Sequence, residues 1–265
     1  MISLSIGLRL LCWMELISEM IMCYNIHHPH ILYKYRIWDN LYHKKVLEDS
    51  SVYLSPPRDF EDKMDCNPAQ IYPSGISLFR FLLRYKQDLP FIQRVNFALK
   101  WYNVSPINYP DELKNIKNQI DNVFNDHFGV LSLTTDSRND FLWERYADHH
   151  KGFCVGFDWN RITRFIRGGG KVIYVKRLPV IDFANDDDDT KIIKTIIYKE
   201  KKWEKENEYR LFKIWDVGQK VIRNIKLPQD AIVQVVLGKR MSAENKREIK
   251  KIVSIKYPNT KVIEM

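Results

Sequence analysis

The amino-acid sequence predicts an α+β fold, with a mixed or antiparallel strand core and a mostly helical insertion at about 74–128. Strand-forming segments come first along the chain, a block of helical patterns interrupts them, and strand-forming segments then return. Hydrophobic residues make up 45% of the 265 residues and aromatic residues 13%, which is enough for a packed core. We therefore expect a single α+β domain over 31–265, preceded by an extension over 1–30 that need not belong to the native protein.

The first part of the domain is predicted to contain two strands and a short helix. Residues 31–36 are rich in strand formers, and a second strand over 51–55 is stopped by two prolines. A short helix fits 40–47 between them. Residues 58–66 then form a polar loop with four carboxylates, which are close enough in sequence to hold a divalent cation. A solvated loop is the simpler interpretation of this segment.

The insertion contains three helical patterns. Two helices are predicted over 76–87 and 91–103, separated by Pro90. The clearest pattern runs over 110–127 and ends before Gly129, a residue that favours helix ends. Its apolar stripe consists of Leu113, Ile116, Ile120, Val123 and Phe124. We expect this block to cap one side of the fold.

The stretch 141–157 has the densest mixture of aromatic residues, charges and glycines in the chain. Trp143 and Tyr146 share one helical face, and Gly152 is predicted to end the helix in the left-handed conformation that glycine adopts cheaply. A strand follows over 153–157. One interpretation is a helix–turn–strand unit of the core. The other places three side chains at the rim of a pocket, namely Tyr146, Asp148 and His149.

The remaining segments alternate between strands and helices. Strands are predicted over 130–134, 171–176, 208–214, 232–237 and 261–264, and helices over 190–202 and 243–253. The acidic run 186–189 is predicted to be a solvated loop.

Charge and cysteine content narrow the class of protein. The net charge of +9 favours an anionic partner such as nucleic acid. The four cysteines show neither zinc-site nor disulfide-framework spacing, which indicates a reducing, cytoplasmic setting. The longest uncharged run near the start is shorter than the ~20 residues of a membrane span, so no membrane partner is expected. The run His27-His28-Pro29-His30 lacks the convergent geometry of a metal site, and no metal is predicted.

Four sequence blocks together resemble a bacterial family known only as a domain of unknown function. The blocks are Leu32-Tyr33-Lys34-Tyr35-Arg36, the segment from Ser55 to Met64, the segment from Trp143 to Phe157, and the segment from Trp203 to Arg210 with its Glu206-Asn207-Glu208. The resemblance covers roughly 31–240, and the third block is the most specific. Glu61 and Lys63 stand where that family usually has Asn and Pro.

The last block also looks like the catalytic strand of ADP-ribosyltransferases, which cleave the bond between nicotinamide and ribose in NAD. Glu206 and Glu208 are two residues apart, so a strand would place both carboxylates on one face, about 6.5–7 Å apart. The resemblance implies NAD as substrate, Glu208 as the catalytic residue that hydrogen-bonds the ribose, and Glu206 on the acceptor side. A fixed carboxylate can stabilise the oxocarbenium-like transition state of this reaction.

The same resemblance implies a set of substrate-binding residues. Arg36, on the first strand, suits the NAD pyrophosphate. Ser55 supplies a hydroxyl from the second strand, and Trp143 or Tyr146 stacks on the nicotinamide. The full predicted binding set is Tyr33, Lys34, Arg36, Ser55, Trp143, Tyr146, His149 and Arg210.

Two other interpretations of these residues stay open. Glu206, Glu208 and Arg210 are also compatible with a structural ion-pair network, in which Lys199, Lys201 or Lys202 takes part. A non-enzymatic ligand sensor or interaction module, as in phage defence or the stress response, would need only a pocket. Convergence of Arg36, Tyr146 and Glu208 on one concave site would favour an enzyme or a ligand sensor.

A nucleic-acid-binding protein or nuclease is a further alternative. The predicted C-terminal helix, 243–253, and its flanks are rich in lysine and arginine that can neutralise phosphates. A nuclease would also need a metal, with Asp59, Asp62, Asp65 and His149 as the candidate ligands. A solvated basic face is the simpler interpretation of the helix.

Overall fold

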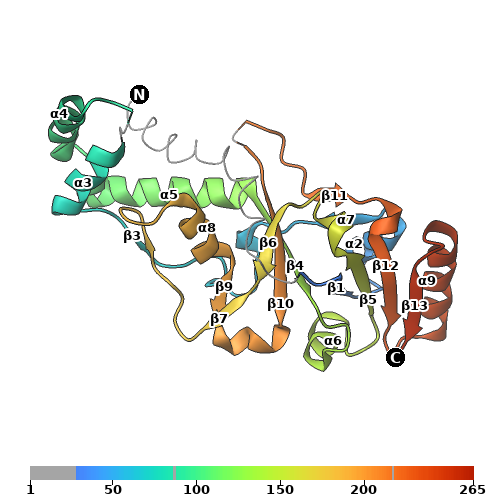
Figure 1. Cartoon of the computed structure of the whole chain (residues 1–265). Helices are drawn as coiled ribbons and strands as arrows, with labels where there is room; N and C mark the ends of the chain where they lie inside the picture. The colour runs from blue at the N-terminus through green and yellow to red at the C-terminus, as the bar shows by residue number, and fades with distance from the viewer. Residues whose placement is uncertain (1–27, 86–87, 217) are drawn as a thin grey trace.

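The computed structural model describes residues 28–85, 88–216 and 218–265 and has an α+β fold, as the sequence predicts (Figure 1). Its main sheet has the strand order β13-β12-β5-β1-β4-β10-β6. Neighbouring strands run antiparallel, except that β12 and β13 run parallel. The strands of this sheet are β1 (Ile31–Arg36), β4 (Phe128–Thr134), β5 (Phe153–Asp158), β6 (Gly168–Lys171), β10 (Glu208–Ile214), β12 (Ile232–Leu237) and β13 (Lys261–Glu264).

Helices and shorter strands complete the fold. The α-helices are α2 (Leu41–Glu48), α3 (Gly75–Tyr85), α4 (Phe91–Tyr102), α5 (Pro110–His127), α6 (Asp140–Tyr146), α7 (Trp159–Ile162), α8 (Asp188–Ile196) and α9 (Ala243–Lys256). The 3-10 helices are η3 (Pro57–Asp59), η4 (Pro106–Asn108), η5 (Lys201–Glu206) and η6 (Gln229–Ala231). Two-stranded sheets pair β2 (Ser51–Tyr53) with β11 (Asn224–Lys226), β3 (Gln70–Ile71) with β8 (Ile181–Asp182), and β7 (Ile173–Val175) with β9 (Tyr198–Glu200). Within the described ranges, the helices are too short or too polar to cross a membrane.

The two faces of the main sheet are covered differently. On one face, a continuous apolar core includes Leu131 and Leu211 and is covered by α2, α7 and α9. On the other face, two separate clusters form, one under α6 around Tyr35 and one under α8 around Val130 and Phe212. The space between these clusters, over β1, β4 and β10, is where polar side chains gather.

The main sheet is partly open between β1 and β4, and we call this opening the seam. The two strands pair at one position of β1, Tyr33, and then separate. Further along, the same edge of β4 pairs with Ser55 instead, through two backbone hydrogen bonds of 2.9 Å between Ser55 and Val130. Between these two pairings, Lys34 Nζ donates a hydrogen bond of 2.6 Å to the carbonyl of Ser132. The side chain of Lys34 therefore lies where, in a continuous sheet, the backbones of β1 and β4 would pair.

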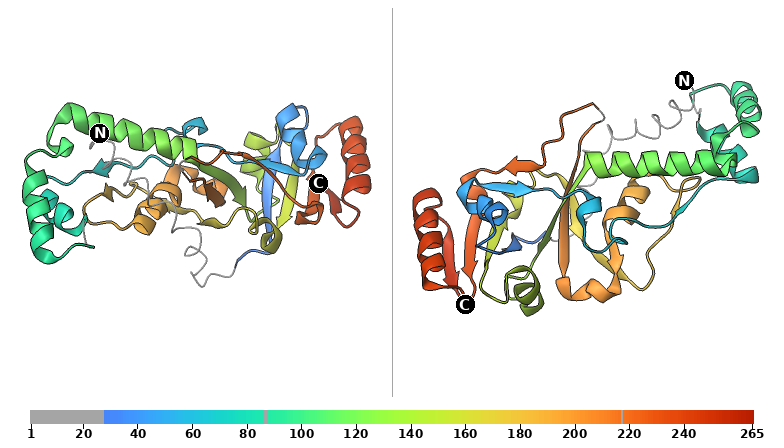
Figure 2. Two further views of the ribbon diagram at one scale, coloured as in Figure 1. Left: turned by 90° about the horizontal axis from the view of Figure 1, so that it is seen from above. Right: turned by 180° about the vertical axis from the view of Figure 1, so that it is seen from behind.

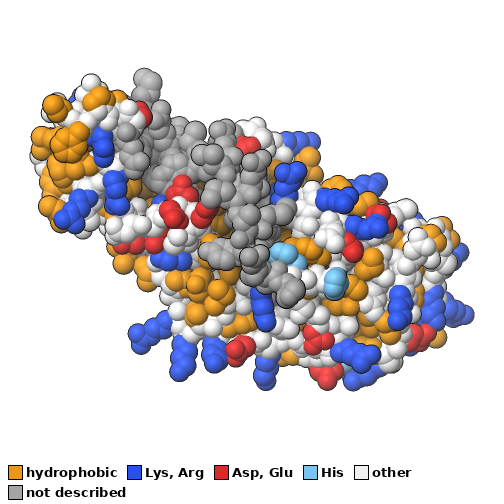
Figure 3. Space-filling view, viewed as in Figure 1, with side chains coloured by type: hydrophobic (Ala, Val, Ile, Leu, Met, Phe, Trp, Pro, Cys, Tyr) orange, Lys and Arg blue, Asp and Glu red, His pale blue; other side chains and the backbone are white. Residues whose placement is uncertain are grey.

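The helical insertion extends away from the sheet, at the opposite end of the molecule from α9 (Figure 2). The helix predicted over 110–127 is confirmed as α5. None of the residues of α5, all of which the structure describes, is fully buried, so its apolar stripe is only half covered. Apolar side chains also gather at the surface of the α3–α4 end (Figure 3), where Ile76, Phe91 and Ile92 are strongly exposed.

Several predicted elements keep their bounds, and others change. The strands over 208–214, 232–237 and 261–264 are confirmed as predicted. The helix predicted over 190–202 is wrong in its second half, because α8 ends at Ile196 and β9 and η5 follow. The strand predicted over 171–176 is split into β6 and β7. The acidic run is not a loop, because Asp187 caps α8 and the next two aspartates lie in its first turn. Residues 1–27 and 86–87, within the predicted extension and first insertion helix, lie outside the described residues.

The turn after α6 differs from the prediction. Three successive residues, Asp148, His149 and His150, have φ between 44° and 65°, a left-handed conformation that costs free energy for residues other than glycine. Gly152 does not adopt it, so its predicted role is wrong. A glycine is needed there because a Cβ atom would lie 2.2 Å from the carbonyl oxygen of Arg36. A Cβ atom at Gly156 would likewise meet the side chains of Ile31 and Tyr33, each at 2.9 Å.

Gly152→Ala is therefore expected to lower the free energy of unfolding by about 3 kcal/mol, because the new methyl group meets backbone that cannot rotate away. Urea unfolding at neutral pH measures this loss. Gly170→Ala is the matched control, since its Cβ would meet only the tip of Ile197, at 3.7 Å. Equal losses for the two variants would contradict the role of the Gly152 contact.

Candidate functional site

A polar pocket of about 240 Å³ opens over the seam, between the clusters under α6 and α8. Most of the predicted site residues line it, namely Tyr33, Lys34, Arg36, Ser55, Tyr146, Glu206 and Glu208. Lys34 and Arg36 alternate with Tyr33 and Tyr35 along β1, yet all four reach the pocket because β4 has separated from β1. Arg36, Tyr146 and Glu208, which come from three separate sequence blocks, therefore converge on one concave site. Such convergence favours an enzyme or a ligand sensor.

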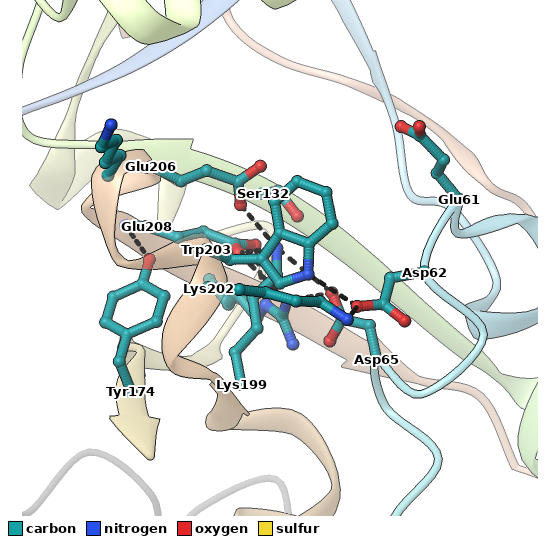
Figure 4. Close-up of polar contacts among 12 residues, drawn as sticks. Glu61, Asp62, Asp65, Ser132, Tyr174, Lys199, Lys202, Trp203, Glu206 and Glu208 are labelled. Atoms are coloured by element: carbon teal, nitrogen blue, oxygen red, sulfur yellow. Dashed lines mark hydrogen bonds and ion pairs between the residues drawn. The ribbon is translucent and has the colours of Figure 1, made fainter. Parts of the chain in front are cut away.

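Four charged side chains at the base of the pocket, Asp65, Lys199, Glu206 and Glu208, lie close together (Figure 4). With Arg210, which holds two of them from behind, they form a group that we call the acid cluster. Lys199 Nζ lies 2.5 Å from Glu206, 2.9 Å from Glu208 and 3.3 Å from Asp65. Arg210 donates through Nε to Glu208 at 2.7 Å and through Nη2 to Asp65 at 2.7 Å. The predicted ion-pair network therefore exists, with Lys199 as its lysine, and all five members are buried.

Local backbone geometry brings the carboxylates together. Glu206 is the last residue of η5, Asn207 adopts a left-handed φ of 44°, and Glu208 begins β10. The two glutamates therefore do not share a strand face, as the sequence predicted, but converge because the chain turns at Asn207. Asp65 is followed by another left-handed residue, Cys66, with a φ of 55°.

The acid cluster carries one negative charge in excess. Burial disfavours the ionised form of Glu208, but Arg210 and Lys199 outweigh it and hold the pKa of Glu208 well below its usual range. Burial likewise opposes the charge of Lys199, yet Glu208 and Asp65 raise the pKa of Lys199 above its usual range. Three carboxylates thus face two cations. Among the described residues, Asp65 Oδ1 is buried with no hydrogen-bond partner.

The part of the lining that β1 contributes has two cations, Lys34 and Arg36, and we call it the cationic wall. Burial, reinforced by Arg36, lowers the pKa of Lys34 to about 7. Burial alone lowers the pKa of Arg36 to about 10, so this group stays charged at neutral pH. Among the residues that the structure describes, no carboxylate forms an ion pair with either cation. Lys34 donates to the Ser132 carbonyl, and Arg36 has a 3.4 Å contact with the Tyr35 carbonyl. This wall is therefore ready to receive an anion.

Aromatic side chains border the pocket. The Tyr146 hydroxyl donates to Glu206 at 2.7 Å, and 38% of Tyr146 remains exposed. Trp203 lies on the other side and donates through Nε1 to Asp62 at 2.6 Å. Asp62 belongs to the segment between η3 and β3, which is thereby tied across the pocket to η5. The guanidinium carbon of Arg145 lies 5.6 Å from the centre of the Tyr146 ring and 4.9 Å from the centre of the Trp203 ring, so a flat ring that passed between the two aromatic side chains would have to displace Arg145.

Three predicted site residues lie elsewhere. Trp143 is fully buried behind Tyr35, with ring centroids 5.0 Å apart, and cannot stack on a ligand. His149 is exposed and pairs with Glu144 at 2.6 Å. Arg210 does not line the pocket but holds Glu208 and Asp65 from behind.

Two members of the acid cluster, Asp65 and Lys199, were not among the predicted site residues. Asp65 was considered as a metal ligand in a loop expected to be solvated, and only its burial reveals its role. Lys199 was placed on the predicted helix, whereas it lies on β9. Its position seven residues before Glu206 carries no periodic signal, because the chain changes from β9 to the 3-10 helix η5 between the two residues.

The residues proposed for a nuclease do not converge. His149 pairs with Glu144, Asp62 with Trp203 and Lys202, and Asp65 with Arg210. Within the described ranges, no group of three His, Cys, Asp or Glu side chains has a geometry that could hold a metal ion. On the basic helix α9, Lys246 and Lys250 are paired with Glu264, which leaves fewer of its charges for phosphates.

The fold and the site together define an α+β protein with a charged pocket whose base is buried. A sequence model of the family described as "Protein of unknown function (DUF2971)" matches residues 142–211. The match spans about a quarter of the chain, from α6 to β10, and includes Tyr146, Lys199, Glu206 and Glu208. It supports similarity to a family of unknown function. Comparison with curated proteins and comparison with solved structures gave no match.

Proposed function

We propose that the polar pocket binds NAD and that the protein transfers the ADP-ribosyl group of NAD to an acceptor. One observation carries this proposal: the two walls of the pocket have opposite charge. The wall of Lys34 and Arg36 suits the pyrophosphate, whereas the acid cluster, with one negative charge in excess, suits the positively charged nicotinamide ring. A ligand that carries an anionic group and a cationic ring in one molecule satisfies both walls.

The chemistry requires a fixed negative charge close to the reacting carbon. When the bond between ribose C1′ and the nicotinamide nitrogen breaks, its electron pair leaves with nicotinamide and C1′ becomes oxocarbenium-like. An acceptor oxygen or nitrogen then bonds to C1′ and loses a proton to solvent. Glu208 supplies the negative charge, because Arg210 and Lys199 keep its carboxylate ionised and fix its position.

The size of the pocket limits which part of NAD it encloses. A volume of about 240 Å³ lies below the roughly 300–1,000 Å³ of typical small-molecule sites. The nicotinamide and its ribose fit such a volume, while the adenosine end lies outside it. Tyr146 lines the pocket and remains 38% exposed, so its ring offers a face on which the nicotinamide stacks.

The test is NAD binding by calorimetry together with nicotinamide release by the purified full-length chain, with bacterial lysate and nucleic acid offered as acceptors. Saturable binding and release of nicotinamide are the expected results. Binding without release would favour the ligand-sensor alternative. Absence of both would overturn the proposal.

The affinity for NAD is expected to fall as the pH rises above about 7. A lysine with a pKa of about 7 is mostly protonated below that pH and mostly neutral above it, and only the protonated form attracts the pyrophosphate. The dissociation constant should therefore increase by up to about tenfold per pH unit between pH 7 and 9. Calorimetry across this range checks the slope.

Lys34→Met is expected to remove this pH dependence, since Arg36 stays charged throughout the range. Lys151→Met changes an exposed lysine that pairs with Asp148 and should leave the slope as it is. A wild-type affinity that is constant from pH 6 to pH 9 would contradict the role of Lys34.

A further inference from the structure

A second cavity, which we call the apolar cavity, lies between the segment 57–70, α5 and α8 and has a volume of about 420 Å³. That volume is within the range of small-molecule sites. Its apolar lining comes from separate parts of the chain, with Val123 and Phe124 on α5, Ile192 on α8, and Ile181 and Phe183 at β8.

The apolar cavity explains why the stripe of α5 is only half covered. A helix with an apolar stripe normally buries it against the domain. Here Ile120, Val123 and Phe124 are each half-buried, and all three face the cavity. Ile192 and Phe183, on the other side, are half-buried as well. Apolar surface left open on several walls of one hollow is typical of a ligand site.

Four of the five charged residues at the rim of the apolar cavity have close partners, and the fifth, Asp121, accepts a hydrogen bond of 3.5 Å from Gln70 Nε2. Arg58 pairs with Asp126 at 2.8 Å, and Lys191 pairs with Asp188 at 3.3 Å. Lys63 Nζ donates to the carbonyls of Arg58 at 3.0 Å and Phe60 at 3.2 Å. A charged ligand would have to break one of these interactions, so the rim favours an uncharged molecule.

We propose that the apolar cavity is a second ligand site, which takes an uncharged and mainly apolar small molecule. It is distinct from the polar pocket, because no residue of the described ranges lines both, although the two adjoin at Asp65 and Cys66. The inference does not depend on NAD, and a failure of the NAD proposal would leave it unchanged.

The probe for this site is N-phenyl-1-naphthylamine, an uncharged apolar dye whose fluorescence increases when it leaves water. A saturable increase with the wild-type protein is expected. Ile192→Trp places a larger ring in the cavity and should weaken dye binding by at least about tenfold. Ile255→Trp is the matched control, because Ile255 is 70% exposed on α9, and it should bind the dye as the wild type does.

A second variant guards against a folding defect in the first. Val123→Trp fills the cavity from α5 instead of α8, and thermal unfolding of each variant identifies the temperature at which it is folded. Loss of binding in a folded Ile192→Trp or Val123→Trp protein supports the site. Unchanged binding in both variants, or no saturable binding by the wild type, overturns it.

Discussion

Replacing Glu208 by glutamine is expected to reduce nicotinamide release from NAD by about 100- to 1,000-fold, the usual loss when one transition-state contact is removed. Glutamine has nearly the shape of glutamate but no negative charge, so the developing positive charge at C1′ loses its nearest counter-charge. Arg210 and Lys199 would then face one carboxylate fewer. The site would change from an excess of negative charge to neutrality.

The measurement is nicotinamide release at saturating NAD, with unfolding curves recorded for each protein. Glu204→Gln is the matched control, because Glu204 lies in the same segment but its side chain is 59% exposed. It should retain wild-type activity. If folded Glu208→Gln released nicotinamide within about tenfold of the wild-type rate, Glu208 would not be the catalytic carboxylate.

Arg210→Met is expected to lower the free energy of unfolding by about 3–5 kcal/mol, because it leaves buried carboxylates without their guanidinium partner. Arg210 is completely buried and holds both Glu208 and Asp65. Methionine preserves much of the volume, so the loss reports charge and hydrogen bonding more than packing. Urea unfolding at pH 7 measures it.

The pH dependence of this loss distinguishes electrostatics from packing. In the wild type, the lowered pKa of Glu208 contributes stability above the pKa of the unfolded chain, about 4.3, and this stability is lost as the pH falls. Without Arg210 that contribution shrinks, so the two proteins should approach each other in stability below about pH 4. Lys213→Met, on the same strand, should cost less than about 1 kcal/mol at any pH. A loss in Arg210→Met that is independent of pH would indicate packing alone.

The sequence patterns that predicted the fold correctly are those with a strong period and a clear end. The helix over 110–127 has a five-residue stripe and a proline at its start, and β10 and β12 are short runs of strand formers. The pattern over 190–202 misled because Ile192, Ile193, Ile196 and Ile197 fit a helix, whereas the next residues pair with β7. Tertiary pairing overrides local propensity there.

The candidate site was predictable only in part. Glu206, Glu208 and Arg36 belong to recognisable blocks, and their convergence follows from the sheet order, which places β1 and β10 on either side of β4. Asp65 and Trp143 show why the rest was not. Asp65 is brought in by a loop whose course has no periodic signal, and an aromatic residue on a helix face can lie in the core as well as in a pocket.

The seam gives the pocket an unusual mechanical property. A hydrogen-bonded ladder normally makes a sheet stiff across its strands, yet β1 and β4 are joined at one register position and by the Lys34 side chain. The cationic wall belongs to the half of the sheet with β5 and β12, and Glu208 to the half with β4 and β6. Within the described residues, this junction is the one in the main sheet that no continuous backbone ladder holds together. A ligand bound to both charged walls would therefore bridge the two halves of the sheet.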